Sequence, residues 1–120
     1  MLPTLRRALR LPGFAAVTAG YLPLYLLEDR LTPEGRKRAV RDRWKRRWSD
    51  ALLRLFAVRP EVHGEAPPQR GGRLIVMNHR SAIDTGLALS LFGGVMVSRG
   101  DLAKWPLVGV AARKTGTLFV

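Results

Sequence analysis

The sequence predicts an α/β protein in which N-terminal membrane-associated helices precede the first strands and helices of a layered domain. Two observations lead to this class. Residues 1–57 hold a long uncharged run followed by an amphipathic helical pattern, whereas residues 58–120 alternate short apolar runs with helical stretches. Such alternation is typical of α/β layer structures. We therefore expect a membrane-docking helical region at 1–57 and a partial α/β domain at 58–120.

The composition agrees with a folded domain and excludes several classes of protein. Apolar residues make up 47% of the chain and charged residues 25%, close to globular averages, which argues against wholesale disorder. The absence of cysteine excludes a disulfide scaffold, a thiolate metal site and a cysteine nucleophile. Two histidines are too few for most metal sites unless carboxylates join them, so we expect no metal ion. We also expect no other bound cofactor.

The charge of the chain is unusual and is concentrated in one segment. The 21 Lys and Arg residues outnumber the 9 Asp and Glu residues, giving a net charge of +12. A surface this basic attracts polyanions such as nucleic acid, anionic lipid or phosphorylated substrates. Eight of the basic residues stand within residues 36–47, where only Asp42 opposes them. We call this segment the basic cluster.

The first expected element is the uncharged run at residues 11–27, which lies between three arginines and the basic cluster. Its length is borderline for a helical membrane span, which needs about 20 residues, and Pro12 and Pro23 weaken a straight helix. We favour a re-entrant or interfacial membrane segment, with a single span, a signal peptide or a buried helix as alternatives. Basic residues on both flanks prefer the cytoplasmic side, which predicts the cytoplasmic face of the bacterial inner membrane.

The second expected element is an amphipathic helix near residues 34–57. Thr32 can cap it and Pro33 suits its first helical position. Apolar residues then recur at spacings of three and four, while Lys and Arg cover the other faces, a pattern that suits an anionic membrane interface. The expected lipid-facing stripe contains Trp44, Trp48, Leu52 and Phe56. Two alternatives remain: the stripe packs on the protein's own core, or the basic cluster belongs to a nucleic-acid-binding module.

The remaining elements follow from apolar runs separated by Pro, Gly and polar residues. We expect a short strand at 61–65, a loop at 66–72 and a buried strand at 73–77. A helix at 82–91 and a second buried strand at 94–98 come next. A helix at 101–112, interrupted by Pro106 and Gly109, leads to a last strand at 116–120.

Candidate catalytic residues lie in the turn from the strand at 73–77 to the helix at 82–91. His79 and Asp84 stand five positions apart, close enough for the carboxylate to hold one ring nitrogen and leave the other as a base. Ser81 is a poor nucleophile for this base because it lies only two residues from His79. The pattern therefore indicates activation of a substrate hydroxyl, and its alternative is a polar loop that caps the helix.

The segment Asn78-His79-Arg80-Ser81-Ala82-Ile83-Asp84 resembles the first motif of the lysophospholipid acyltransferases, Asn-His-x-Ser-x-x-Asp after a buried strand. Lys104, Pro106 and Gly109, followed by the Gly-x-x-Phe sequence at 116–119, are similar to the next stretch of that family in the same order. The resemblance covers residues 58–120. The basic front half agrees with the family's N-terminal helices in character only.

The resemblance implies transfer of a fatty acyl group from acyl-CoA or acyl carrier protein to the hydroxyl of a lysophosphatidic acid-like lysophospholipid. His79 would be the general base and Asp84 would orient it. Asn78, Arg80, Ser81 and Lys104 would bind substrate or support the loop, although Asn78 could equally bond its own loop and Lys104 could be solvated. The implied partners are an anionic membrane surface, the lysolipid and the acyl donor, with no nucleic acid.

One departure from the family pattern concerns the end of the chain. The family's substrate-binding arginine would follow Val120, and its Glu-Gly-Thr-Arg motif would come later. We therefore expect the chain to be the N-terminal part of a longer enzyme or a truncated product. A non-catalytic membrane-binding fragment is the alternative function.

Overall fold

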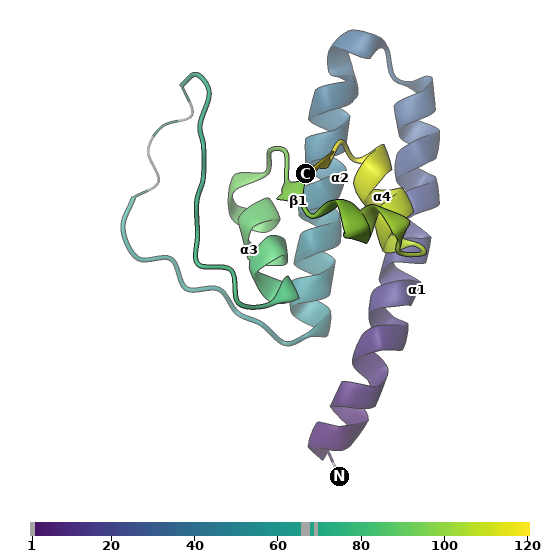
Figure 1. Cartoon of the computed structure of the whole chain (residues 1–120), viewed down its shortest axis with the longest axis vertical. Helices are drawn as coiled ribbons and strands as arrows, with labels where there is room; N and C mark the ends of the chain where they lie inside the picture. Colours follow the sequence, from purple (N-terminus) through teal and green to yellow (C-terminus); the bar gives the residue numbers. More distant parts are fainter. Residues whose placement is uncertain (1, 66–67, 69) are drawn as a thin grey trace.

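The computed structural model describes residues 2–65, 68 and 70–120. It is mostly helical (Figure 1). Helices α1 (Leu2–Leu31) and α2 (Glu34–Leu55) form an antiparallel hairpin. The rest of the described chain contains α3 (Ala82–Phe92), β1 (Val97–Ser98), the 3-10 helix η1 (Gly100–Lys104), α4 (Val108–Lys114) and β2 (Leu118–Phe119).

The hairpin is held together by aromatic side chains of α2 that lie on α1. The Trp48 ring meets Phe14 edge to face at 6.0 Å, and the Trp44 ring meets Tyr21 in the same way at 5.9 Å. Each indole N–H also has a hydrogen-bond acceptor on α1: Trp48 donates to Thr18 Oγ1 at 3.0 Å, and Trp44 donates to Glu28. Both tryptophans are half-buried, and burying tryptophan is favourable when its ring packs and its N–H is bonded, as it is here.

The expectation that the stripe of α2 faces lipid is wrong in this structure. Trp44 donates to Glu28 Oε2 at 2.6 Å, Leu52 is buried, and the Phe56 ring lies under the Arg10 guanidinium. Together with Trp48, these side chains therefore cover the protein's own helices, as in the core-packing alternative. The physical reason is that the uncharged run before the stripe supplies an apolar helix for it to pack against.

The two prolines expected to weaken a straight helix do not break α1. Pro12 and Pro23 both lie inside the continuous helix. Each proline removes a backbone N–H, but both residues are exposed while other positions of α1 pack along α2. The packing of α1 against α2 thus stabilises a helix that continues through both prolines. Within the described residues, none of the helices combines the length and the apolar character that crossing a membrane requires.

The turn between the two helices differs from its expected capping. The Thr32 hydroxyl donates to the Glu28 carbonyl at 2.6 Å, at the end of α1. Pro33 takes the N-cap position of α2, and no side chain bonds the first amides of that helix. Thr32 therefore satisfies a carbonyl that the end of α1 leaves without an intrahelical partner, instead of capping α2.

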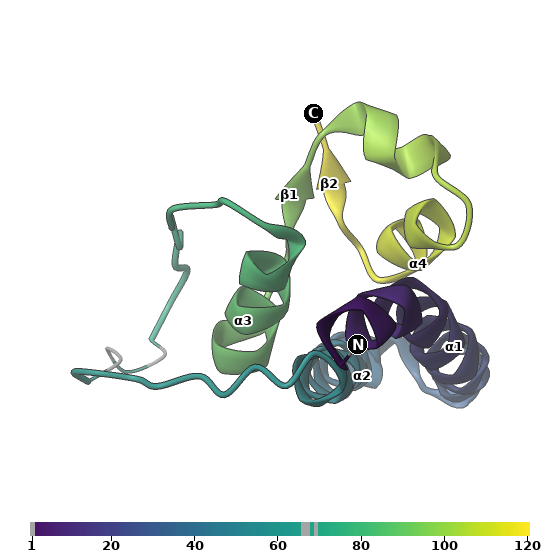
Figure 2. The same ribbon diagram turned by 90° about the horizontal axis from the view of Figure 1, so that it is seen from below.

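The α/β character of the second half rests on a small parallel ladder. Val97 of β1 pairs with Leu118 of β2, and Ser98 pairs with Phe119. The connection between the two strands runs through η1 and α4 (Figure 2). The helical structure breaks at residues 105–107, so the interruption expected at Pro106 is confirmed, whereas the one expected at Gly109 is absent because Gly109 lies inside α4. The helix expected at 82–91 is α3.

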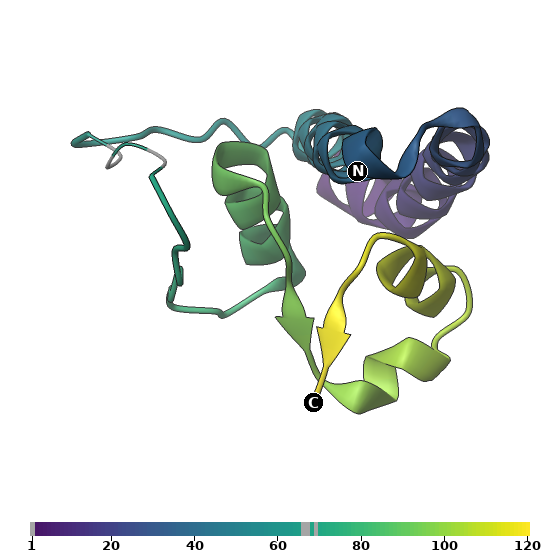
Figure 3. The ribbon, with the colours of Figure 1, turned by 90° about the horizontal axis from the view of Figure 1, so that it is seen from above.

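Several expected strands are shorter than predicted or absent. The strands at 94–98 and 116–120 reduce to two residues each. Residues 61–65 and 73–77 are not strands; they are exposed, including Leu74 and Val76. The chain there projects away from the ladder (Figures 2 and 3), so these residues have no neighbouring strand to bond. The loop expected at 66–72 includes residues 66, 67 and 69, which lie outside the described residues.

Helix α2 lies between α1 and α3, and part of its basic cluster faces inward. Lys45 is only 6% exposed; its ammonium group contacts Asp42 Oδ1 at 3.1 Å and donates to the Gly94 carbonyl. Arg46 donates to the Phe92 carbonyl at 3.3 Å. A buried ammonium group needs such partners, and these carbonyls stand at the C-terminal end of α3, where cations are favoured.

Candidate active site

The turn before α3 is organised by the Asp84 carboxylate. Ser81 has extended backbone angles, φ −152° and ψ 164°, and serves as the N-cap of α3. Asp84 is the third residue of the helix, and its Oδ2 accepts the backbone N–H groups of Arg80 at 2.6 Å and of Ser81 at 2.8 Å. This is the reverse bond of a capping box, in which the third helical residue reaches back to the cap.

The same carboxylate oxygen faces the histidine. His79 Nδ1 lies 3.4 Å from Asp84 Oδ2. The His79 side chain is 62% exposed and that of Asp84 is 21% exposed. An Nδ1–H that points at a carboxylate leaves Nε2 without a proton in the neutral ring. The arrangement therefore presents a basic nitrogen on an accessible ring.

The charge of Asp84 is stabilised chiefly by the main chain. The backbone N–H groups of Arg80 and Ser81 lower the pKa of Asp84 from its model-compound value of 3.8, and the neighbouring His79 lowers it further. Partial desolvation acts in the opposite direction. Hydrogen bonds to the ionised form favour it, so Asp84 remains a carboxylate at neutral pH.

The other expected site residues take different places. Arg80 and Ser81 contribute backbone N–H groups, and both are exposed. Asn78 is exposed in the extended segment before His79, and Lys104 is exposed at the end of η1. Neither the Asn78 nor the Lys104 side chain bonds another residue in the part of the chain that the structure describes. The structure thus gathers His79, Arg80, Ser81 and Asp84, and leaves Asn78 and Lys104 outside.

Sequence reasoning missed the residues that hold α3 in place. The Ser90 hydroxyl of α3 donates to Asp50 of α2, and Lys45 and Arg46 bond carbonyls at the far end of α3. The only signals in the sequence are that Ser90 interrupts the apolar second half of α3 and that Asp50 is one of the few acidic residues in a strongly basic helix. In the described ranges, no three His, Cys, Asp or Glu side chains gather as they would around a metal ion.

Comparison with known proteins gives consistent matches. Residues 59–120 match the family model described as Acyltransferase. A lyso-ornithine lipid O-acyltransferase of Pseudomonas aeruginosa is 35% identical over 97% of the chain and 44% of its own length. A protein of the same name from Rhizobium meliloti is 34% identical over 65% of the chain and 27% of its own length.

A third match carries a different name. A 1-acyl-sn-glycerol-3-phosphate acyltransferase of Neisseria meningitidis serogroup B is 26% identical over 73% of the chain and 32% of its own length. The chain therefore spans less than half the length of each of these relatives. No solved structure matches the chain significantly.

Proposed function

The chain belongs to the lysophospholipid acyltransferase family, and from this premise we propose that it takes part in transferring a fatty acyl group from an acyl thioester to a lysolipid hydroxyl. The division of labour follows the two halves of the sequence. Residues 58–120 carry the catalytic base, and residues 1–57 bring it to the membrane where the lysolipid resides. The donor is acyl-CoA or acyl carrier protein, and no resident cofactor is needed.

His79 is the general base of this proposal. Its Nε2 takes the proton of the acceptor hydroxyl as the oxygen attacks the thioester carbonyl. The new C–O ester bond forms, the C–S bond breaks, and the imidazolium returns the proton to the departing thiolate. Asp84 orients the ring through Nδ1–H and stabilises the imidazolium. General-base catalysis of this kind contributes about 10²–10⁴-fold to the rate.

One observation carries the assignment: the 3.4 Å approach of His79 Nδ1 to an Asp84 oxygen that two backbone N–H groups hold in place. A carboxylate fixed in this way gives the ring one orientation, which a base needs. Asn78 and Lys104 remain candidates for substrate contacts because both side chains are exposed and unbonded within the described residues.

Replacement of each histidine in turn tests the assignment, since the chain has only two. We expect His79→Ala to lower the turnover number of the purified protein by about 10²–10⁴-fold. His63→Ala is the matched control, because His63 is 88% exposed and lies beside Glu61, away from the α3 turn. It should leave turnover unchanged. Equal turnover in the two variants would remove His79 from the mechanism.

The relatives suggest two acceptors. Two relatives are named for lyso-ornithine lipid and one for 1-acyl-sn-glycerol-3-phosphate. The first relative aligns with nearly the whole chain, which favours a lyso-ornithine lipid as a second candidate beside the lysophosphatidic acid-like acceptor. Assays with each lysolipid under the same donor distinguish them, because only the true acceptor should give a high kcat/KM.

The proposed membrane surface is the outer face of α1 and not the stripe of α2. Because α2 covers the inner side of α1, the outer face of α1 is left with exposed apolar side chains that share one side of the helix by their spacing: Leu5, Leu9, Leu24, Leu27 and Leu31. Arg6, Arg7 and Arg10 stand before the uncharged run, whereas Glu28, Asp29 and Arg30 follow it directly. A helix with an exposed apolar face and a basic N-terminal end suits the interface of an anionic bilayer. We place this surface at the cytoplasmic face of the bacterial inner membrane.

A further inference from the structure

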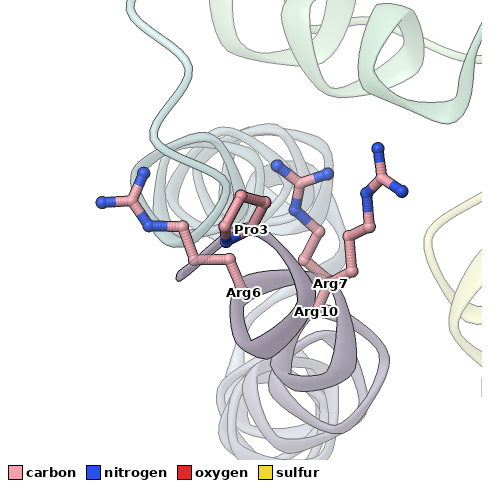
Figure 4. Close-up of a pocket in the computed structure, with 4 residues that line it drawn as sticks. All are labelled: Pro3, Arg6, Arg7 and Arg10. Carbon is pink, nitrogen blue, oxygen red and sulfur yellow. The ribbon is translucent and has the colours of Figure 1, made fainter. Parts of the chain in front are cut away.

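Three arginines line one cavity near the start of α1. Pro3, Arg6, Arg7 and Arg10 surround a volume of about 360 Å³ that opens to solvent (Figure 4). The guanidinium groups of Arg7 and Arg10 lie on one side of the helix, and that of Arg6 lies on the other side of Pro3. The cavity is therefore flanked by cationic groups from two directions.

The charges around this cavity are not balanced by acidic groups. Arg6 and Arg7 make no ion pair within the described residues, and the first turn of α1 contains no acidic side chain. Like charges at spacings of three and four on a helix repel one another, and cations near a helix N-terminus oppose its dipole. A bound anion would relieve both unfavourable interactions.

Arg10 is held in position from the second helix. Its guanidinium carbon lies 6.0 Å from the centre of the Phe56 ring at the end of α2. A cation over an aromatic face is attracted to the ring, so this contact orients the Arg10 guanidinium group and leaves its charge available to a ligand. The cavity thus has one positioned cation and two that are free of ion pairs in the described structure.

We propose that Arg6, Arg7 and Arg10 bind the phosphate group of an anionic phospholipid at the membrane surface. Guanidinium groups bind phosphate oxygens through paired hydrogen bonds, which a lysine ammonium, acting as a point charge, does not form. The lipid, rather than a free phosphate, is the ligand because the exposed side chains of Leu5 and Leu9 stand among the same arginines and suit the acyl boundary. The inference refines the proposed docking face of α1 by naming its headgroup site.

Flotation with vesicles tests this site in the whole protein. The vesicles are phosphatidylcholine alone, phosphatidylcholine with phosphatidylglycerol, and phosphatidylcholine with a fatty acid that supplies the same surface charge as carboxylate. The variant is Arg6→Gln with Arg7→Gln and Arg10→Gln. The matched control removes the same charge elsewhere, by Arg36→Gln, Arg38→Gln and Arg59→Gln, all at exposed positions.

We expect the wild type to bind phosphatidylglycerol vesicles more tightly than the carboxylate vesicles. The α1 variant should bind phosphatidylglycerol vesicles on the order of 100-fold more weakly, which corresponds to about 1 kcal/mol per arginine. The control variant should lose less than about 10-fold, since its arginines lie outside the cavity. Circular dichroism confirms that both variants keep their helices.

Three results would overturn the proposal. Equal losses in the two variants would mean that only net charge matters. Equal binding to both anionic vesicles would mean that negative surface charge, and not the headgroup of the anionic phospholipid, accounts for binding. Displacement by inorganic phosphate at constant ionic strength would make the ligand a soluble phosphate and not a lipid. Flotation does not involve acyl transfer, so any of these results would leave the assignment of His79 intact.

Discussion

The helical hairpin and the turn that holds His79 reach their geometry in opposite ways. In the hairpin, the bonds join distant residues: Trp48 reaches Thr18, 30 positions away, and Trp44 reaches Glu28, 16 positions away. In the turn, Asp84 accepts hydrogen bonds from the backbone of Arg80 and Ser81, four and three positions away. The turn is therefore a local structure. The geometry of the hairpin depends instead on long-range packing, because the aromatic side chains of α2 need the surface of α1 to cover them.

The largest expected effect is on catalysis and comes from the local structure. In Asp84→Asn, the amide oxygen can still accept the backbone N–H groups, but the charge that stabilises the imidazolium is lost. We expect the turnover number to fall by roughly 10²–10⁴-fold with little change in KM for the lysolipid. Steady-state kinetics checks this result.

The alternative role of Asp84 as a helix cap gives a different outcome. Asn caps a helix almost as well as Asp, so under that role Asp84→Asn would be close to silent in turnover. Asp84→Glu serves as a second variant, because it keeps the charge but moves the carboxylate beyond the ~0.5 Å tolerance of such constellations. Full turnover in both variants would reject the pair as catalytic.

The next effect is on stability and comes from the hairpin. Trp48→Ala removes the ring that meets Phe14 and the bond to buried Thr18, so we expect a loss of about 3–5 kcal/mol in the free energy of unfolding. Leu74→Ala, at a position 88% exposed, should change it by less than about 0.5 kcal/mol. Urea unfolding followed by circular dichroism measures both.

A milder variant keeps this comparison informative if Trp48→Ala does not fold. Trp48→Phe retains an aromatic ring and removes only the N–H donor, which leaves the buried Thr18 hydroxyl without this partner. We expect a loss of about 1–3 kcal/mol, the cost of an unsatisfied buried polar group. A larger loss for Leu74→Ala than for Trp48→Phe would contradict the division into a dense hairpin and an exposed segment.

The smallest expected effect is the pH dependence contributed by Asp84. Its pKa in the folded protein lies below the model-compound value of 3.8, so the unfolded state binds a proton first as the pH falls. The stabilisation is present above pH 3.8 and is lost as the pH falls through the lower folded pKa. Thermal melts of the wild type should lose more stability across this window than melts of Asp84→Asn. Parallel curves would show that the carboxylate does not support the turn.

The sequence by itself determined the features whose causes lie within a few residues. The His79–Asp84 approach and the start of α3 follow from the spacing of polar groups across one helical turn. The break near Pro106 follows from proline's missing N–H and fixed φ. The apolar stripe of α2 was also readable, because helical periodicity depends only on the order of residues.

Only the tertiary structure decided what each apolar surface covers. The stripe of Trp44, Trp48, Leu52 and Phe56 fits a lipid interface or a neighbouring helix equally well by pattern, and the packing of α1 selects the helix. The sequence predicts that the basic cluster faces a polyanion, yet Lys45 points inward because the Gly94 carbonyl beyond α3 lies within its reach. Residues 73–77 have the composition of a buried strand but remain exposed, since a strand needs a neighbour to bond and sequence alone does not supply one.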